Sequence, residues 1–180
     1  MTDMVLRRMT EYQFGYAGLA DVPILAILIE RAYRGPEAAK GWTNESMLLT
    51  GPRSSPGEVE SLIRNKDSRF VTARYGGKIV GCALIQKHGE GAYFGMFAID
   101  PDIQGGGLGK AVVTRCEAAA RELWAAKYLR LTVISLRDKL IAWYERRGFV
   151  QTGEHEPFPF ETATGALRTD FDLTVLQKPL

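Results

Sequence analysis

The sequence reads Gln104-Gly105-Gly106-Gly107-Leu108-Gly109-Lys110 at the junction of two very different segments. The residues before it, 93–101, are apolar and aromatic and end in Asp-Pro, which is typical of a strand that stops there. The residues after it, 111–123, have helical spacing. A strand, a glycine loop and a helix in this order bring backbone N–H groups and a positive helix terminus together, which suits a phosphate group. We therefore expect this loop to hold a phosphorylated cofactor.

The spacing within the loop excludes two common nucleotide motifs. A P-loop needs a glycine where this chain has Gln104 and a hydroxyl where it has Ala111. A dinucleotide fingerprint needs its third glycine where this chain has Lys110. A flexible linker is the plainer alternative, but a linker does not account for a strand and a helix on either side. The pattern that remains is Gln-x-x-Gly-x-Gly.

This pattern resembles the pyrophosphate-binding loop of the GNAT superfamily, the acyl-CoA-dependent N-acyltransferases. A second segment supports the resemblance: residues 129–135 alternate like a strand, and the helical pattern that follows ends in Tyr144-Glu145-Arg146-Arg147-Gly148-Phe149. This ending is similar to the Tyr-Glu-x-x-Gly-Phe ending that family members carry in the same place. With the hairpin that precedes the loop, the resemblance covers residues 69–153, about half of the chain.

The resemblance implies a mixed α/β fold of the α+β type. It implies a twisted, mostly antiparallel sheet of about seven strands flanked by about four helices. Its fourth and fifth strands, residues 92–99 and 129–135 here, would splay apart and admit the acyl-CoA arm. The periodicity itself gives the order β-α-α-β-β-β-α-β-α-β-β, with a hairpin around Gly76-Gly77 and a last strand at 169–176.

The family pattern also implies roles for particular residues. The loop would bind the cofactor through Gln104, Gly105, Gly106, Gly107, Leu108, Gly109 and Lys110, and the fourth strand through the backbone of Phe97, Ala98 and Ile99. The N–H of Phe97 would stabilise the oxyanion that forms during attack. Tyr144 would be the general acid that protonates the leaving thiolate. Arg137 stands where the family often has a cofactor-binding Asn, and we expect it to contact the cofactor at a phosphate instead.

The general base has several candidates. Glu45, in Trp42-Thr43-Asn44-Glu45, lies in the region that borders the acceptor site in similar proteins, and His88 and Glu90 flank the turn before the fourth strand. We take Glu45 as the candidate base, although each of the three also fits a solvated loop. The aromatic residues that could line an acceptor pocket, or equally belong to an ordinary core, are Trp42, Tyr93, Phe158 and Phe160.

Composition narrows the class of protein. The chain has 180 residues, 46% hydrophobic and 24% charged, which predicts a single domain over residues 1–180. A net charge of +2 with scattered basic residues argues against nucleic acid as a partner, and no apolar run is long enough for a membrane span. Cys82 and Cys116 are isolated and predict buried thiols in a reducing, cytoplasmic compartment. Two distant histidines favour neither a metal site nor a serine-type triad.

The function that the resemblance implies is N-acetyl transfer from acetyl-CoA, as co-substrate, to a primary amine by direct attack. The acceptor amine could belong to a small molecule or a peptide, and a homodimer is allowed because similar proteins are often dimers. The alternative is a non-catalytic module that binds or senses acyl-CoA, since such a module would keep the same glycine loop.

Overall fold

A computed structural model of the chain describes residues 12–34, 36–40, 43–103, 105–163 and 165–180. Two residues that the sequence singled out, Trp42 and Gln104, lie outside the described residues. The elements are β1 (Gln13–Tyr16), the 3-10 turn η1 (Leu19–Asp21), α2 (Val22–Tyr33), the 3-10 turn η2 (Pro36–Lys40), α3 (Pro56–Arg64), β2 (Ser68–Tyr75), β3 (Lys78–His88), β4 (Gly91–Ile99), α4 (Leu108–Trp124), β5 (Tyr128–Ile134), α5 (Asp138–Glu145), β6 (Val150–Glu156) and β7 (Leu173–Pro179).

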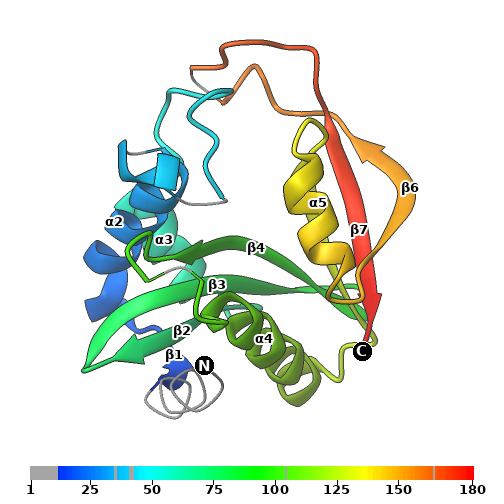
Figure 1. The fold of residues 1–180 in the computed structure, drawn as a ribbon. Coiled ribbons are helices and arrows are strands. Elements are labelled where there is room, and N and C mark those ends of the chain that lie inside the picture. The colour runs from blue at the N-terminus through cyan, green and yellow to red at the C-terminus, as the bar shows by residue number, and fades with distance from the viewer. Residues whose placement is uncertain (1–11, 35, 41–42, 104, 164) are drawn as a thin grey trace.

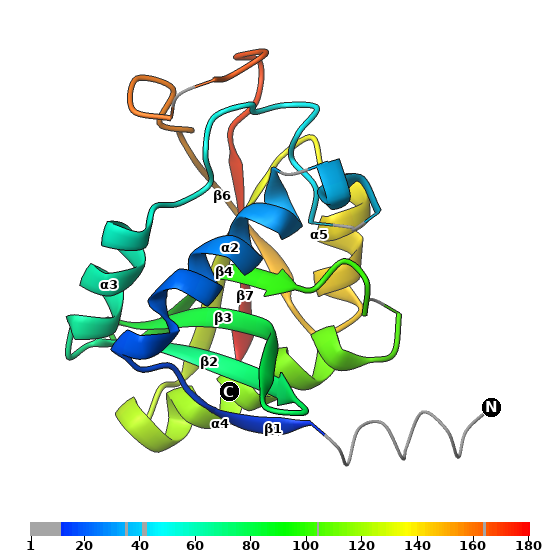
Figure 2. The ribbon, with the colours of Figure 1, turned by 90° about the vertical axis from the view of Figure 1, so that its left-hand side faces the viewer.

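In the described part of the chain, seven strands form one sheet in the order β1-β2-β3-β4-β5-β7-β6. Every neighbouring pair is antiparallel except β4 and β5, which are parallel. Helices α2 and α3 cover one face of the sheet, and α4 and α5 cover the other (Figures 1 and 2). The predicted α+β class and mostly antiparallel sheet are confirmed. None of the helices among the described residues combines the length and apolarity that a membrane span requires.

Strands β4 and β5 touch only where they begin. They pair at Ala92 with Leu129 and at Tyr93 with Arg130, and beyond these two positions they are not paired with each other. Figure 1 shows the sheet opening at this point, with β4 on one side and α5 and β7 on the other. The predicted splay of the fourth and fifth strands is therefore present.

A β-bulge bends β4 beside this opening. Leu84 of β3 pairs with Gly95, and Cys82 pairs with Ala98, so β4 carries one more residue than β3 over this stretch. Met96 takes up the extra length with a φ of 44°, a left-handed conformation that side chains other than glycine seldom adopt. The bulge therefore changes the direction of the β4 backbone next to Phe97.

Each face of the sheet has its own apolar core. The α4 and α5 face buries Phe94, Phe97, Leu108, Val112, Cys116, Leu129, Tyr144 and Phe149 with further aliphatic residues. The α2 and α3 face buries Leu25, Leu28, Ile29, Tyr33, Val59, Phe70, Cys82, Leu84 and Met96 with others. Both cysteines are free and buried, as predicted from their isolation.

The end of the chain departs from the sequence-based prediction. The last strand was predicted at 169–176, but β7 runs over Leu173–Pro179, so the predicted start is wrong by four residues. Phe171 instead leaves the sheet and packs with Phe158 and Phe160, at centroid distances of 4.9 and 5.0 Å. Residues 154–156, which precede the Pro157 and Pro159 loop, belong to β6, an edge strand that is exposed along most of its length.

Glycine is required where β4 meets β5. A Cβ at Gly91 would lie 2.4 Å from the ring of Tyr128, the first residue of β5. We expect Gly91→Ala to lower the free energy of unfolding by about 1–3 kcal/mol, because the Tyr128 ring must shift to relieve the overlap. Urea unfolding would measure the change. Gly15→Ala, in β1 with no atom within 4 Å of the added Cβ, is the matched control and should change stability by less than about 0.5 kcal/mol. Equal effects in both variants would contradict the packing argument.

The buried thiols should be chemically silent in the native protein. Burial raises the pKa of Cys82 to about 12 and raises the pKa of Cys116 well above its usual value, so both remain protonated at neutral pH. The thiolate is the reactive form. We expect no reaction of native protein with Ellman's reagent near pH ~8, and reaction of 2 thiols after unfolding in guanidinium. Rapid labelling of the native protein would contradict this expectation.

Candidate functional site

A cavity of about 530 Å³ lies where β4 and β5 diverge. One wall is residues 93–97 of β4 and the opposite wall is residues 131–134 of β5. The end of α2, the α5 residues Leu140 and Tyr144, the loop before α3 and the segment around Phe158 complete the lining. Aromatic and aliphatic walls with a few charged groups are typical of small-molecule sites.

Tyr144 lines this cavity, and the Gly148-Phe149 turn that follows it in the sequence helps to fix its position. The N–H of Gly148 donates to the carbonyl of Glu145 at 2.9 Å, and Gly148 has a φ of 88°, so the chain turns back after α5. Phe149 then packs edge-on against the Tyr144 ring at 5.5 Å, and Phe94 of β4 does the same at 6.3 Å. Burial, reinforced by the neighbouring Tyr33 hydroxyl, raises the pKa of Tyr144 well above its usual value. The hydroxyl therefore keeps its proton at neutral pH and can donate it.

Tyr33, the last residue of α2, contacts the β4 bulge from the face of the sheet that α2 and α3 cover. Its hydroxyl donates to the carbonyl of Phe97 at 2.8 Å, and burial raises the pKa of Tyr33. The thiol of Cys82 lies 3.8 Å from the carbonyl of Met96. Two successive carbonyls of the bulge thus face polar side chains from α2 and β3, which fixes the orientation of the β4 backbone at Phe97.

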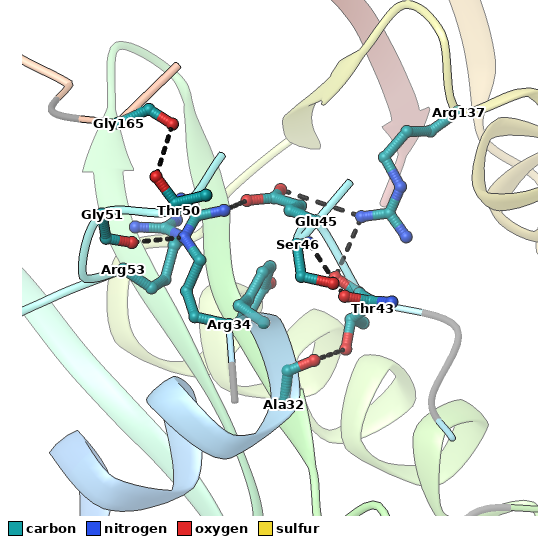
Figure 3. Close-up of polar contacts among 12 residues, drawn as sticks. Ala32, Arg34, Thr43, Glu45, Ser46, Thr50, Gly51, Arg53, Arg137 and Gly165 are labelled. Atoms are coloured by element: carbon teal, nitrogen blue, oxygen red, sulfur yellow. Dashed lines mark hydrogen bonds and ion pairs between the residues drawn. The ribbon is translucent and has the colours of Figure 1, made fainter. Parts of the chain in front are cut away.

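Glu45 lies between two arginines at the rim of the cavity (Figure 3). Its Oε2 is 2.7 Å from Arg34, and its Oε1 is 3.7 Å from Arg137. The three side chains are 9–13% exposed, so this is a largely desolvated group of charges. Arg137 also donates to the carbonyl of Thr43 at 3.0 Å. Arg137 therefore connects the start of α5 to the loop that carries Glu45.

This loop is fixed at its far end by a distant part of the chain. Leu49 forms a β-bridge with Ala166, and the N–H of Thr50 donates to the carbonyl of Gly165 at 2.8 Å. A Cβ at Gly165 would lie 2.3 Å from the nitrogen of Gly51, so only glycine permits this approach. Figure 1 shows the two segments meeting above the opening of the sheet. Two loops that are distant in sequence therefore meet beside the cavity, and residues of both line it.

The glycine loop leads into a helix whose N-terminus has no side-chain cap. Gly105 and Gly107 have φ of 101° and 83°, and added Cβ atoms at Gly105 and Gly106 would meet nothing within 4 Å. Gly107 is the N-cap of α4, and the first turn contains no acidic residue. In contrast, α3 is capped by the Ser55 hydroxyl and has Glu58 in its first turn. The N–H groups that begin α4 are therefore available to an anionic ligand.

A second cavity, of about 640 Å³, lies between α4 and the turn after α5. It is lined by Lys110, Val113, Thr114, Glu117, Arg146, Arg147, Gly148 and Lys178. Lys178 pairs with Glu117 at 2.6 Å, which leaves the other basic side chains of the lining without a carboxylate there. This cavity suits phosphate groups more than an ammonium group.

The structure brings part of the predicted site together. Phe97, Tyr144 and the candidate base Glu45 line the first cavity, as do Tyr93 and Phe158. Ala98 and Ile99 continue β4 towards the glycine loop, Lys110 lines the second cavity, and Arg137 lies behind Glu45. Phe160 packs on Phe158 and Phe171, while His88 and Glu90 contact Tyr128 and Lys127 instead of the cavity. The cofactor-binding and catalytic roles remain predictions.

Sequence reasoning missed several residues of the cavity, namely Tyr33, Arg34, Arg53 and Ser54. In the sequence, Gly51-Pro52-Arg53-Ser54-Ser55 has the composition of a loop, which by itself indicates no binding role. The described residues contain no group of three or more His, Cys, Asp or Glu side chains that could hold a metal ion.

Comparisons with known proteins agree with this geometry. Residues 36–149 match the sequence model of the acetyltransferase (GNAT) family. An IAA acetyltransferase from Azospirillum brasilense is 32% identical over 94 residues, which are 51% of this chain and 61% of that protein. The chain thus spans about 61% of the length of that curated relative.

Two solved structures share the fold. The ribosomal-protein-S18-alanine N-acetyltransferase from Escherichia coli superimposes with a TM-score of 0.69 at 20% identity, covering 93% of each chain. The spermidine N-acetyltransferase from Vibrio cholerae, in complex with CoA and spermine, gives a TM-score of 0.67 at 18% identity, covering 94% of this chain and 96% of that one. At these identities the likeness shows the arrangement of elements.

The pairing of Glu45 with Arg34 should stabilise the fold. Glu45→Gln removes the negative charge but keeps the shape, and it leaves two guanidinium groups without their carboxylate. We expect a loss of about 2 kcal/mol in the free energy of unfolding, measured by urea titration. Glu60→Gln breaks an exposed pair with Arg64 on α3 and should cost less than about 0.5 kcal/mol. Unchanged stability in Glu45→Gln would show that the pair contributes nothing net.

Proposed function

The chain belongs to the acetyltransferase (GNAT) family, and on that premise we propose that it transfers an acetyl group from acetyl-CoA to a primary amine of a small molecule or peptide. The observation that carries the proposal is that Tyr144 lines the cavity between β4 and β5 together with Phe97. An uncapped helix N-terminus and a basic cavity lie on the same side of the sheet as Tyr144. This combination suits a CoA thioester whose phosphates bind near the start of α4 and whose acyl group meets an amine in the first cavity.

The residues present fit the phosphates of CoA. The backbone of Gly105, Gly106, Gly107, Leu108, Gly109 and Lys110, with Gln104 before them, would bind the pyrophosphate at the start of α4. Arg146, Arg147 and the Lys110 side chain would provide positive charge in the second cavity. The backbone of Phe97, Ala98 and Ile99 would receive the pantetheine arm as an added strand. Arg137 is already engaged by Thr43 and Glu45, so a phosphate contact by Arg137 would add to these bonds.

Acyl transfer to an amine needs a proton acceptor and a proton donor. We assign the donor to Tyr144, whose raised pKa keeps the hydroxyl protonated until the sulfur leaves. The N–H of Phe97 would stabilise the oxyanion, and Tyr33 would keep that part of β4 in place through the Phe97 carbonyl.

The proposed base is Glu45, which lines the cavity. Its two carboxylate oxygens lie 2.7 Å from Arg34 and 3.7 Å from Arg137, which hold the side chain in the cavity lining. Transfer through a water molecule would be compatible with this arrangement. If Glu45 is the base, Glu45→Gln should remove the acidic limb of the pH profile of kcat, and a purely structural role would leave that limb in place.

The two free, buried cysteines support a reducing compartment, and we propose that the protein acts in the cytoplasm. Its partners would be acetyl-CoA and an amine-bearing acceptor. A homodimer is compatible with the exposed edge strand β6.

Tyr144→Phe tests the proposal directly. Because the variant lacks the donor but keeps the ring contacts, we expect kcat to fall by roughly 10²-fold or more while acetyl-CoA binding stays within a few-fold. Thiol release would measure turnover, with a panel of amines and peptides as acceptors, and calorimetry would measure binding. Tyr75→Phe, an exposed tyrosine at the end of β2, is the matched control and should retain full activity.

The outcomes separate the alternatives. Tight acetyl-CoA binding by the unmodified protein without thiol release from any acceptor would favour a non-catalytic acyl-CoA sensor. Absence of acetyl-CoA binding would overturn the proposed function. Equal turnover by the Tyr144→Phe and Tyr75→Phe variants would remove Tyr144 from the mechanism.

A further inference from the structure

Arg53 is a charged side chain that lines the first cavity without a polar partner. Its guanidinium lies over the ring of Tyr33, 5.0 Å from the centroid, and makes no hydrogen bond or ion pair with any described residue. Burial lowers the pKa of Arg53, and the nearby Tyr33, Glu45, Tyr93 and Glu58 raise it more, so the group stays charged. An arginine in such a place normally has an acceptor.

Arg34, the neighbouring arginine in this cavity, has hydrogen-bond acceptors for its guanidinium group. Arg34 donates to the carbonyl of Gly51 at 2.9 Å and to Glu45 at 2.7 Å. The carboxylate of Glu45 is thus shared between Arg34 and Arg137, and neither of its oxygens is paired with Arg53. Arg34 and Arg53 are close enough for the second to lower the pKa of the first. Arg53 therefore lies near a second arginine without a share of the Glu45 carboxylate (Figure 3).

Ser54 provides a second, independent indication. Its hydroxyl is buried in the lining of the same cavity and has no hydrogen-bond partner among the described residues. Buried hydroxyls are nearly always bonded, so an unbonded one leaves a donor without an acceptor beside Arg53. Protein atoms cover the Ser54 oxygen in this rotamer, and a rotation of the side chain would bring it to a ligand. The unpaired donors of Arg53 and Ser54 are adjacent in sequence and line one wall.

The backbone around these donors is held firmly. The N–H of Arg53 donates to the Glu30 carboxylate at 2.9 Å, and the Gly51 carbonyl accepts from Arg34. On the other side of Arg53, Ser55 caps α3 by accepting from the N–H of Glu58 at 3.1 Å. A ligand would therefore bind here with little ordering of the loop.

We propose that Arg53, with Ser54, binds a carboxylate of the acceptor, so that the acceptor is an amino acid or another amino-carboxylate. This inference rests on the proposed acetyl transfer. The planar guanidinium can form a bidentate pair with a carboxylate, in which two parallel N–H groups donate to its two oxygens. Tyr33 connects Arg53 to the reaction site, because its ring contacts Arg53 and its hydroxyl binds the Phe97 carbonyl. The amine of an amino acid bound at Arg53 would then lie beside the β4 bulge.

The charges of the cavity disfavour the other acceptor classes. A polyamine would place ammonium groups beside Arg34 and Arg53. Of the two lining carboxylates, Glu45 is already paired with arginines, so Glu58 alone would offset that repulsion. A dianionic phosphate would be repelled more strongly than a carboxylate by Glu45 and Glu58, which line the same cavity. A ligand group with a single negative charge, such as a carboxylate, therefore suits the position beside Arg53 best.

The test uses matched acceptors that differ only in the carboxylate. Thiol release from acetyl-CoA is measured with each amino acid, with its carboxamide and with spermidine, for the unmodified protein and for Arg53→Gln. We expect at least one amino acid to exceed its carboxamide in kcat/KM by roughly 10-fold or more. In Arg53→Gln we expect this preference to disappear. KM for the amino acid should rise by roughly 10- to 100-fold with little change in kcat, and both constants for the carboxamide should stay the same.

Arg64→Gln is the control, because it makes the same replacement at an exposed position on α3 and should leave the preference intact. We expect Arg53→Gln to keep its melting temperature, since its guanidinium forms no hydrogen bond within the described protein. Faster turnover of spermidine or of carboxamides than of any amino acid, unaltered in Arg53→Gln, would overturn the inference and leave acetyl transfer standing. If no acceptor is turned over at all, calorimetry of CoA-saturated protein with the amino acids decides: binding lost in Arg53→Gln supports the carboxylate site, and absence of binding overturns it.

Discussion

The separation of β4 from β5 after two residue pairs is the constraint on which the site depends. Parallel strands that stayed paired would fill this space with hydrogen bonds, and the Tyr144 hydroxyl would face a closed sheet. The strands are kept together at one end by the close approach of Gly91 and Tyr128, and both continue to pair with their other neighbours, β3 and β7. Each strand therefore keeps one paired neighbour, and the gap between the two is where we propose that the pantetheine arm binds.

The bulge at Met96 and its contacts fix the direction of the β4 backbone beside the opening. A backbone N–H that stabilises an oxyanion, the role proposed for Phe97, must have a fixed direction. The left-handed Met96 stores strain that the surrounding contacts must offset, and the Tyr33 hydroxyl is one such contact on the Phe97 carbonyl. Helix α2 thus positions the β4 backbone as well as covering the sheet.

Local sequence predicted the parts of the site that are local in the chain. The glycine loop with its helix, and the Tyr144 to Phe149 turn, are each determined within a few residues, so their pattern was readable. Arg53 meets Tyr33 and Arg34 through contacts that span the loop before α3, which also bridges to Gly165 and Ala166, more than a hundred residues away. No periodicity marks such a contact. The start of β7 was missed for a related reason, since Phe171 packs in a loop cluster and its apolar character imitates a strand.

The distribution of charge separates the two ends of the opening. Basic side chains near α4 and the turn after α5 are mostly free of carboxylates, which suits a ligand with several phosphates. At the other end, where we propose that the acceptor binds, arginines and carboxylates are nearly balanced, and Glu45 is shared by two of the arginines. A multiply charged ligand of either sign would meet repulsion there, so the cavity selects for small net charge. An amine that also carries a carboxylate satisfies this condition, because its ionised groups cancel each other and each can meet a partner of opposite sign.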